Sequence, residues 1–135
     1  MKLLPDTNVL IYDTIEDCEH HSLAADIIDK AAEIYMLPIV VHEYIWVMLK
    51  LVQVSPSFVS VKVREYLEDP KTVYMLETVD VLTNSLRMIE EDKQNIKEVN
   101  DYIILATALK YNLTLATFDK KLKKTASERK LKVIP

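Results

Sequence analysis

The chain of 135 residues contains no glycine. The loops that hold phosphate groups in P-loop and dinucleotide-binding proteins need glycine, both for tight turns and for close approach of the backbone to phosphate. Those two classes of nucleotide-binding protein are therefore excluded. Any chemistry on a phosphate group must rely here on side chains or on a bound metal ion.

Cysteine and long hydrophobic runs are also scarce. The single cysteine, Cys18, cannot form a disulfide within the chain. Only a few apolar residues follow Met1, fewer than a secretory signal requires. The longest apolar tract, Ile34 to Val54, is interrupted by proline and by charged residues, so it falls short of a membrane span of about 18 residues. We expect a cytoplasmic protein with no membrane segment.

Basic residues do not predominate, because the net charge is −4. Proteins that bind nucleic acid usually rely on Lys and Arg to neutralise phosphates. The segment from Lys120 to Lys132, however, holds seven basic residues and one acid, so it carries +6 and the remainder of the chain carries −10. A basic edge beside an acidic pocket fits a metal-dependent nuclease, and a solvated final helix would show the same charge pattern.

The length, with half of the residues apolar, indicates a single domain over residues 1–135. Within it, short apolar runs alternate with stretches of helical periodicity. The predicted strands lie near residues 2–5, 34–37, 72–76, 113–116 and 131–134, and the predicted helices cover 21–32, 39–54 and 58–67 and begin near 78, 100 and 120. This alternation predicts a three-layer α/β/α sandwich around a mainly parallel sheet of four or five strands.

The predicted helix from Ile39 to Val54 is apolar on nearly all sides. A helix without a polar face is usually buried on more than one side. In a domain of this size, the second surface is expected to come from another subunit. We therefore predict a homodimer that forms through this helix.

Four acidic residues lie at positions that packing alone does not explain. Asp6 follows the first predicted strand and Asp119 follows the fourth, and parallel sheets bind ligands at the edge where their strands end. Glu43 and Asp101 each share a helix face with apolar residues three and four positions away. Carboxylates are rarely buried unless they are paired or hold a metal. We interpret the four acids as one divalent-metal site that hydrolyses phosphodiester bonds of RNA.

The oxygen ligands favour Mg²⁺ or Mn²⁺, because these ions retain waters that leave room for a phosphate. A zinc site is disfavoured, since the spacing of the cysteine and the histidines matches no familiar ligand pattern. Taken singly, three of the acids are better explained as caps or first-turn charges of helices, namely Asp6, Asp101 and Asp119. Glu43 lies within a helix, where a solvated edge position is the alternative. Taken together, the four acids point to one rim of a parallel sheet.

The motifs resemble those of the PIN domain family, in order along the whole chain. They are Asp-Thr-Asn-Val-Leu-Ile-Tyr at residues 6–12, Glu43, Asn-Asp at 100–101 followed by Ile-Ile-Leu-Ala-Thr-Ala at 103–108, and Thr-Phe-Asp at 117–119. Within that family the chain looks like the toxin ribonucleases of VapBC-type toxin-antitoxin pairs, whose length it matches. The resemblance implies a PIN-like fold, Mg²⁺- or Mn²⁺-dependent endoribonuclease activity on RNA, and an antitoxin protein as a possible partner.

Carried over residue by residue, the resemblance implies that the metal is held, and catalysis carried, by Asp6, Glu43, Asp101 and Asp119. Polar support is implied for Asn8, Asn100 and Thr117. The basic edge supplies the candidate RNA contacts, which are Lys120, Lys121, Lys123 and Lys124. The family often has Ser or Thr shortly before the helical glutamate, whereas this chain has Pro38 to Val41 there. This departure affects the expected substrate contacts near the glutamate more than the metal site.

Two other functions remain open on the sequence alone. A phosphohydrolase with an aspartyl nucleophile would also place an acid after its first strand, but it needs a second aspartate two residues on, where this chain has Asn8. A non-catalytic PIN-like module that only binds RNA or a protein would keep the same motifs, because acidic residues alone do not demonstrate turnover.

Overall fold

Short apolar runs form the strands of one sheet in the computed structural model, which describes residues 1–93 and 98–135. The strands are β1 (Lys2–Pro5), β2 (Glu33–Met36), β3 (Thr72–Tyr74), β4 (Thr114–Ala116) and β5 (Val133–Ile134). Their order across the five-stranded sheet is β3-β2-β1-β4-β5, and each neighbouring pair is parallel. The predicted α/β class with a mainly parallel sheet is confirmed.

The central strand β1 is buried because helices cover both faces of the sheet. Leu3 pairs with Ile34 of β2 on one side and with Thr114 of β4 on the other. The side chains of Leu3 and Leu4 are fully buried. The strand order reverses between β1 and β4, and the crevice at such a reversal is where open α/β sheets bind ligands.

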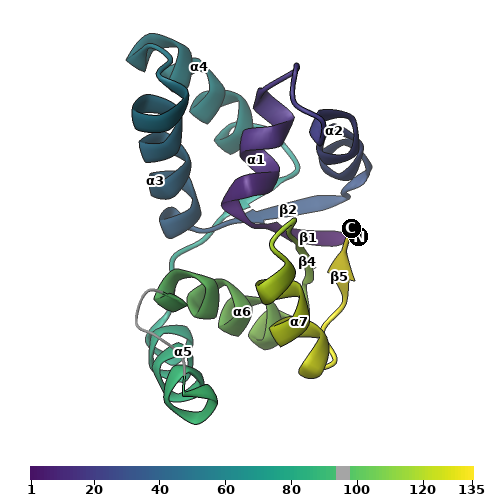
Figure 1. The fold of residues 1–135 in the computed structure, drawn as a ribbon, viewed down its shortest axis with the longest axis vertical. Helices are drawn as coiled ribbons and strands as arrows, with labels where there is room; N and C mark the ends of the chain where they lie inside the picture. Colours follow the sequence, from purple (N-terminus) through teal and green to yellow (C-terminus); the bar gives the residue numbers. More distant parts are fainter. Residues whose placement is uncertain (94–97) are drawn as a thin grey trace.

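Seven helices and one π-helical segment surround the sheet in the described part of the chain. Four helices lie on one face, which is the upper one in Figure 1: α1 (Thr7–Thr14), α2 (His21–Lys30), α3 (Pro38–Val47) and α4 (Pro56–Leu67). The other three lie on the opposite face: α5 (Val79–Asp92), α6 (Val99–Tyr111) and α7 (Lys120–Glu128). The predicted three layers are therefore present. Within residues 1–93 and 98–135, none of the helices has the length and apolar character needed to cross a membrane.

The apolar helix predicted from Ile39 to Val54 is divided in the structure. It consists of α3, with Pro38 in its first turn, followed by the π-helical segment η1 (Met48–Val52). One side packs into the core, but Trp46 and Leu51 on the outer side are 55% and 67% exposed. Within one chain, this helix is thus covered on a single side.

Other boundaries differ by a few residues. The chain enters α1 directly after Asp6, and only residues 15–20 separate α1 from α2. Strands β3, β4 and β5 are shorter than predicted. Four residues near helix ends adopt the left-handed conformation although none is glycine, with φ between 52° and 64°: Gln53, Lys93, Asn112 and Lys130.

Candidate active site

The junction between β1 and α1 fixes Asp6 at the rim where the parallel strands end. The Asp6 N–H donates to the Ala116 carbonyl oxygen at 2.8 Å, which extends the pairing of β1 with β4. The Asp6 backbone is extended, and its Oδ1 accepts from the Thr7 N–H at 2.8 Å, which caps α1. Asp6 is only 5% exposed, so its carboxylate is buried at the end of the central strand.

Two neighbouring polar side chains hold the second oxygen of Asp6. The Thr117 hydroxyl, just after β4, donates to Asp6 Oδ2 at 2.8 Å, and Asn8 Nδ2 donates to the same oxygen at 3.2 Å. Thr117 Oγ1 also accepts from the Asp119 N–H at 3.0 Å, and Asn8 Oδ1 accepts from the Phe118 N–H at 3.2 Å. These bonds join α1 to the segment after β4 and orient the Asp6 carboxylate.

Helices from opposite faces of the sheet meet beside this carboxylate. Asn100, in the first turn of α6, donates from Nδ2 to Oε2 of Glu43 on α3 at 3.2 Å. Figure 1 shows α3 above the sheet and α6 below it. The negative charge of Glu43 reaches Asp6, where it contributes to a raised pKa. The contact therefore joins the two outer layers at the rim.

The remaining two acids occupy the starts of helices. Asp119 caps α7, because its Oδ1 accepts from the N–H groups of Lys121 and Leu122 at 2.8 and 3.2 Å. Asp101 lies in the first turn of α6 and is half-buried. The capping roles considered from the sequence thus occur for Asp6 and Asp119. Capping explains the hydrogen bonds that Oδ1 of each carboxylate accepts. It does not explain why both acids lie at the same rim of the sheet.

The acids influence each other electrostatically, although they come from four separate parts of the fold. Burial raises the pKa of Asp6 to about 6, and the charges of Glu43 and Asp119 act in the same direction. The hydrogen bonds to the Asp6 carboxylate lower its pKa but do not cancel the rise. Burial likewise raises the pKa of Asp101 to about 7, and the charges of Asp6 and Asp119 add to this effect. The fold therefore places all four predicted acids in one neighbourhood.

This donor set suits a hard divalent cation. Carboxylates supply only oxygen ligands, which Mg²⁺ and Mn²⁺ prefer. A cation among them would also remove the repulsion that contributes to the raised pKa values of Asp6 and Asp101. In addition, the buried hydroxyl of Thr7, the residue after Asp6, has no hydrogen-bond partner in the described part of the chain. A buried hydroxyl without a partner is unusual in folded proteins.

The oxygens do not surround a common point. Within residues 1–93 and 98–135, no three His, Cys, Asp or Glu side chains are arranged so that they could hold a metal ion. Both oxygens of Asp6 and Oδ1 of Asp119 accept hydrogen bonds from the protein. For three of these acids to hold one ion, some of their side chains would have to rotate.

One acid of this region is missing from the sequence prediction. Glu98 lies immediately before α6, three residues ahead of Asp101, and its hydrogen bond with that carboxylate contributes to the raised pKa of Asp101. Its Oε1 accepts from Lys121 Nζ at 3.0 Å. Glu98 thus connects the acidic rim to the basic helix α7. The spacing of three residues at a helix start was the available signal, because such residues share one face.

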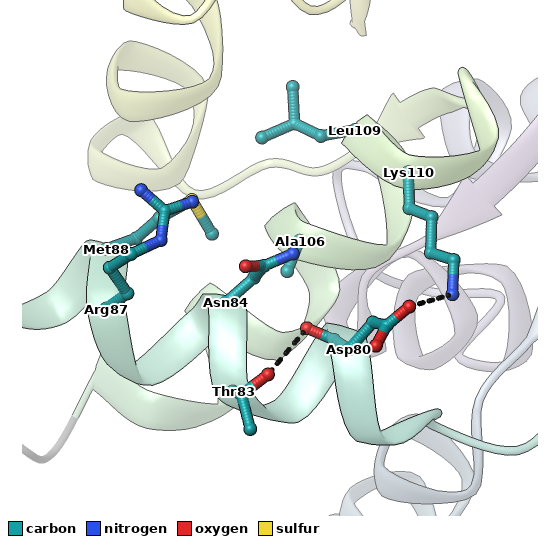
Figure 2. A pocket seen from close by; sticks show the side chains of 8 residues that line it. All are labelled: Asp80, Thr83, Asn84, Arg87, Met88, Ala106, Leu109 and Lys110. Carbon is teal, nitrogen blue, oxygen red and sulfur yellow. Dashed lines mark hydrogen bonds and ion pairs between the residues drawn. The ribbon is translucent and has the colours of Figure 1, made fainter.

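A hollow lies away from the acids, between α5 and α6 (Figure 2). It has a volume of about 450 Å³, and its lining includes Asp80 and Arg87 of α5 and Lys110 of α6. Asp80 is paired with Lys110 at 3.4 Å, and Arg87 is paired with Glu91 at 2.9 Å. Since none of the four predicted acids lines this hollow, it is separate from the candidate site.

The fold and the acidic rim define the class of protein. A five-stranded parallel sheet in the order β3-β2-β1-β4-β5 carries carboxylates at the ends of β1 and β4. The family model of the PIN domain matches residues 3–128, nearly the whole chain. The chain therefore belongs to the PIN domain family, as the motifs predicted.

Solved structures share this fold. VapC20 of Mycobacterium tuberculosis, described as a toxin that cleaves the sarcin-ricin loop, has a TM-score of 0.76 and 13% identity over 91% of this chain and 94% of its own. FitAcB of Neisseria gonorrhoeae has a TM-score of 0.70 and 19% identity over 98% and 96%. VapBC2 of Rickettsia felis, bound to promoter DNA, has a TM-score of 0.69 and 16% identity over 100% and 98%. Among curated proteins, no sequence matches this chain.

We expect the metal-free protein to become more stable as the pH falls towards 5. The folded pKa values of Asp6 and Asp101, about 6 and about 7, lie above the usual aspartate pKa of 3.8, so the native state binds more protons between these limits. The stability that these groups contribute is present below the unfolded pKa and is lost as the pH rises through the folded values. The full shift at Asp6 corresponds to about 3 kcal/mol, of which roughly half is recovered between about pH 8 and about pH 5.

Denaturant unfolding with EDTA at the two pH values measures this effect. Asp6→Asn removes one of the titrating groups, so its free energy of unfolding should change less with pH than that of the wild type. Asp26→Asn serves as the matched control, because Asp26 is an exposed partner of Lys30 on α2. Equal pH dependence in wild type and Asp6→Asn would show that the Asp6 carboxylate does not titrate as described.

Proposed function

We propose that the protein is a Mg²⁺- or Mn²⁺-dependent endoribonuclease whose site consists of Asp6, Glu43, Asp101 and Asp119. The observation that carries this proposal is the gathering of four carboxylates, from two strand ends and two helices, at one rim of the sheet. Crowded carboxylates oppose folding, since burial and like charges both disfavour their ionised forms. A bound divalent cation offsets this cost, and a phosphodiester is a substrate suited to such a site.

The residues of the chain have distinct roles in this proposal. Asp6 provides a ligand of fixed orientation, because Thr117 and Asn8 both donate to its Oδ2. Asn100 positions Glu43 through the hydrogen bond to Oε2. The chemistry supplied by bound Mg²⁺ or Mn²⁺ is the activation of a water and the stabilisation of charge on the scissile phosphate.

The basic helix α7 supplies the surface for the RNA backbone. It begins at the acidic rim, because Asp119 caps its first turn. Lys120, Lys123 and Lys124 lie on this helix, and Lys121 reaches back to Glu98. Lysine contacts to phosphates orient a nucleic acid without reading its sequence. With −10 on the remainder of the chain, α7 and the residues after it offer phosphates their most favourable approach.

We further propose that this activity belongs to the toxin component of a toxin-antitoxin pair, which acts in the cytoplasm and is held by an antitoxin protein. Membership of the PIN domain family supports this role. Likeness in fold to VapC20, a toxin, and to the VapBC2 and FitAcB structures supports it as well.

A homodimer through α3 and η1 is part of the same proposal. The exposed Trp46 lies beside a hollow of about 280 Å³ that Ile45 and Leu49 also line, and this surface is almost entirely apolar. Contiguous exposed apolar surface usually marks an interaction site. A second copy of the chain would cover it, in keeping with the apolar sequence of this helix.

A PIN-like module that binds RNA or a protein without cleavage is the second candidate. The observation that favours it is the engagement of Asp6 and Asp119 by hydrogen-bond donors of the protein itself. Among the described residues, no three acids are set to hold an ion without movement. Cleavage with and without metal separates the two candidates.

Millimolar Mg²⁺ or Mn²⁺ is expected to raise the melting temperature of the protein. A ligand that binds only the native state stabilises it by mass action, by about 2.7 kcal/mol at a hundredfold excess over its Kd. Thermal unfolding with metal and with EDTA measures the rise. Asp101→Asn should lose most of it, and Asp26→Asn, on the exposed side of α2, should keep it. An equal rise in Asp101→Asn would place the ion elsewhere.

Asp6→Asn is expected to abolish cleavage of mixed RNA in Mn²⁺ while leaving the metal-free fold at least as stable. The amide oxygen can still accept from the Thr7 N–H, and the variant loses a buried charge. Gel analysis of the RNA, with EDTA as a blank, measures cleavage, and urea unfolding measures stability.

Glu65→Gln, an exposed acid on α4 that pairs with Lys62, is the matched control and should cleave like the wild type. Cleavage by folded Asp6→Asn would exclude this rim as the active site. Unfolding of Asp6→Asn would instead assign the carboxylate a purely structural role as a helix cap.

Trp46→Glu is expected to convert a dimer into a monomer, because it places a charge at the centre of the proposed apolar interface. Size-exclusion chromatography with light scattering measures the mass of each protein. In the wild type and in the control variant, the fluorescence of the single tryptophan also reports its burial. Leu76→Glu is the control, since Leu76 is 77% exposed and lies outside α3 and η1. A wild-type chain that is monomeric at high concentration would refute the predicted dimer.

A further inference from the structure

Three aromatic rings from separate parts of the chain meet beside the acidic rim. They are Tyr12 on α1, His20 immediately before α2, and Phe118 between β4 and α7. Their centroids are 4.9 Å apart for Tyr12 and His20, 5.1 Å for Tyr12 and Phe118, and 4.9 Å for His20 and Phe118. We call these three residues the aromatic cluster.

The aromatic cluster is connected to the acids by covalent and hydrogen bonds. Phe118 lies between Thr117, which donates to Asp6, and Asp119. The Phe118 N–H donates at 3.2 Å to Oδ1 of Asn8, whose amide nitrogen donates to Asp6. Tyr12 follows Asn8 by one turn of α1, which brings it to the same side of that helix. A molecule bound at the acids would therefore lie next to these rings.

The rings of the aromatic cluster are only partly used in packing. All three residues are half-buried, and the side chain of His20 is 41% exposed. Tyr12 and Phe118 meet edge to face, with 78° between their planes, and the His20 ring is tilted against them by 46° and 34°. None of the three pairs is stacked face to face, so parts of the ring faces are left for other partners. By contrast, the ring of Tyr44 in the core is 1% exposed and contacts Tyr66. Loop packing alone does not require three rings at this rim.

Partly exposed aromatic rings beside a site for phosphodiesters can bind the bases of a nucleic acid by stacking. Proteins recognise single-stranded RNA by stacking splayed-out bases on Phe, Tyr and His rings. Stacking involves no charge on the protein, so an acidic rim does not weaken it as it weakens contacts to phosphate. The chain has a net charge of −4 and carries its excess of basic residues in one segment, so an uncharged contribution to RNA binding would be significant.

We propose that the aromatic cluster binds an unstacked nucleobase of the nucleotide adjoining the phosphate at the acidic rim. The proposal rests on RNA being the substrate. The cluster is held in advance, since the Asn8 bond fixes the backbone of Phe118 and His21 Nδ1 lies 2.9 Å from the Tyr12 carbonyl oxygen. The site therefore selects single-stranded RNA, because the bases of a duplex are already stacked on one another.

The test is the binding of short single-stranded RNAs that carry 2-aminopurine at successive positions, in millimolar Mg²⁺, with the fluorescence recorded before the RNA is cleaved. Stacking on a ring quenches 2-aminopurine, so binding to the wild type should lower the fluorescence at one position. Phe118→Leu should lose this quenching and weaken binding about tenfold, as expected for the loss of one stacked base. Phe118→Trp, which restores a ring, should recover both. A duplex of the same sequence should bind more weakly than the single strand.

Phe58→Leu is the matched control, because it makes the same substitution at an exposed phenylalanine on α4 and should leave both readouts unchanged. The metal-induced rise in melting temperature, measured on each variant, verifies that the acidic rim is intact. Unchanged quenching and affinity in Phe118→Leu would overturn the proposal and leave the aromatic cluster as loop packing. Cleavage of RNA by the wild type without any quenching would overturn the proposed role of the aromatic cluster and leave the endoribonuclease assignment standing. A wild type that neither binds nor cleaves RNA would refute the endoribonuclease assignment as well.

Discussion

The hydrogen bond from the Thr117 hydroxyl to Asp6 Oδ2 is the contact on which the arrangement of the rim depends. It joins residues 111 positions apart, at the place where the strand order reverses between β1 and β4. The same hydroxyl oxygen accepts from the Asp119 N–H, so one side chain sets the position of two acids. A parallel sheet makes this possible, because neighbouring strands end at the same edge and the residues that follow them face one another.

The acidic rim and the basic helix are parts of one electrostatic arrangement. Asp119 belongs to both, since its Oδ1 caps α7 and its charge raises the pKa values of Asp6 and Asp101. Glu98 and Lys121 form a second connection between them. Movement of the Asp119 side chain towards a cation would weaken the cap of α7, which is a contribution of about 1 kcal/mol in typical helices. Events at the rim are thereby coupled to the order of the helix that carries the lysines.

Most of the fold could be predicted because a strand that is buried on both faces of a sheet is a continuous apolar run. In β1 this run includes Leu3 and Leu4, which precede the first acid. The sequence indicated a helix after Asp6 only through the possible capping role of this residue, because threonine, asparagine and valine are weak helix formers. In the structure, packing of Val9 and Leu10 in the core overrides that weak preference. The change from α3 to the π-helical η1 could not be predicted, because a tract that is apolar on all sides shows no change of periodicity there.

Some features of the candidate site could also be predicted from the sequence, and others could not. Positions after strands and on apolar helix faces indicated which four acids to consider, and the structure shows that their charges interact. Their role as one metal site stays a prediction. The family resemblance implied polar support from Asn8, Asn100 and Thr117, and these side chains do donate to Asp6 and Glu43. The particular carboxylate oxygen that each one meets could not be predicted, because it depends on the tertiary fold. Glu98 was overlooked because a glutamate before a helix is unremarkable until its contacts with Asp101 and Lys121 are seen.

The absence of glycine affects both the strain of the folded backbone and the flexibility of the unfolded chain. The chain turns through the left-handed region at Gln53, Lys93, Asn112 and Lys130, where residues with a Cβ atom are strained relative to glycine. In exchange, its denatured ensemble is less flexible than that of a glycine-containing chain, so less entropy is lost when the backbone becomes ordered. Among residues 1–93 and 98–135, this strain falls at helix termini, whereas the entropic gain is spread along the backbone.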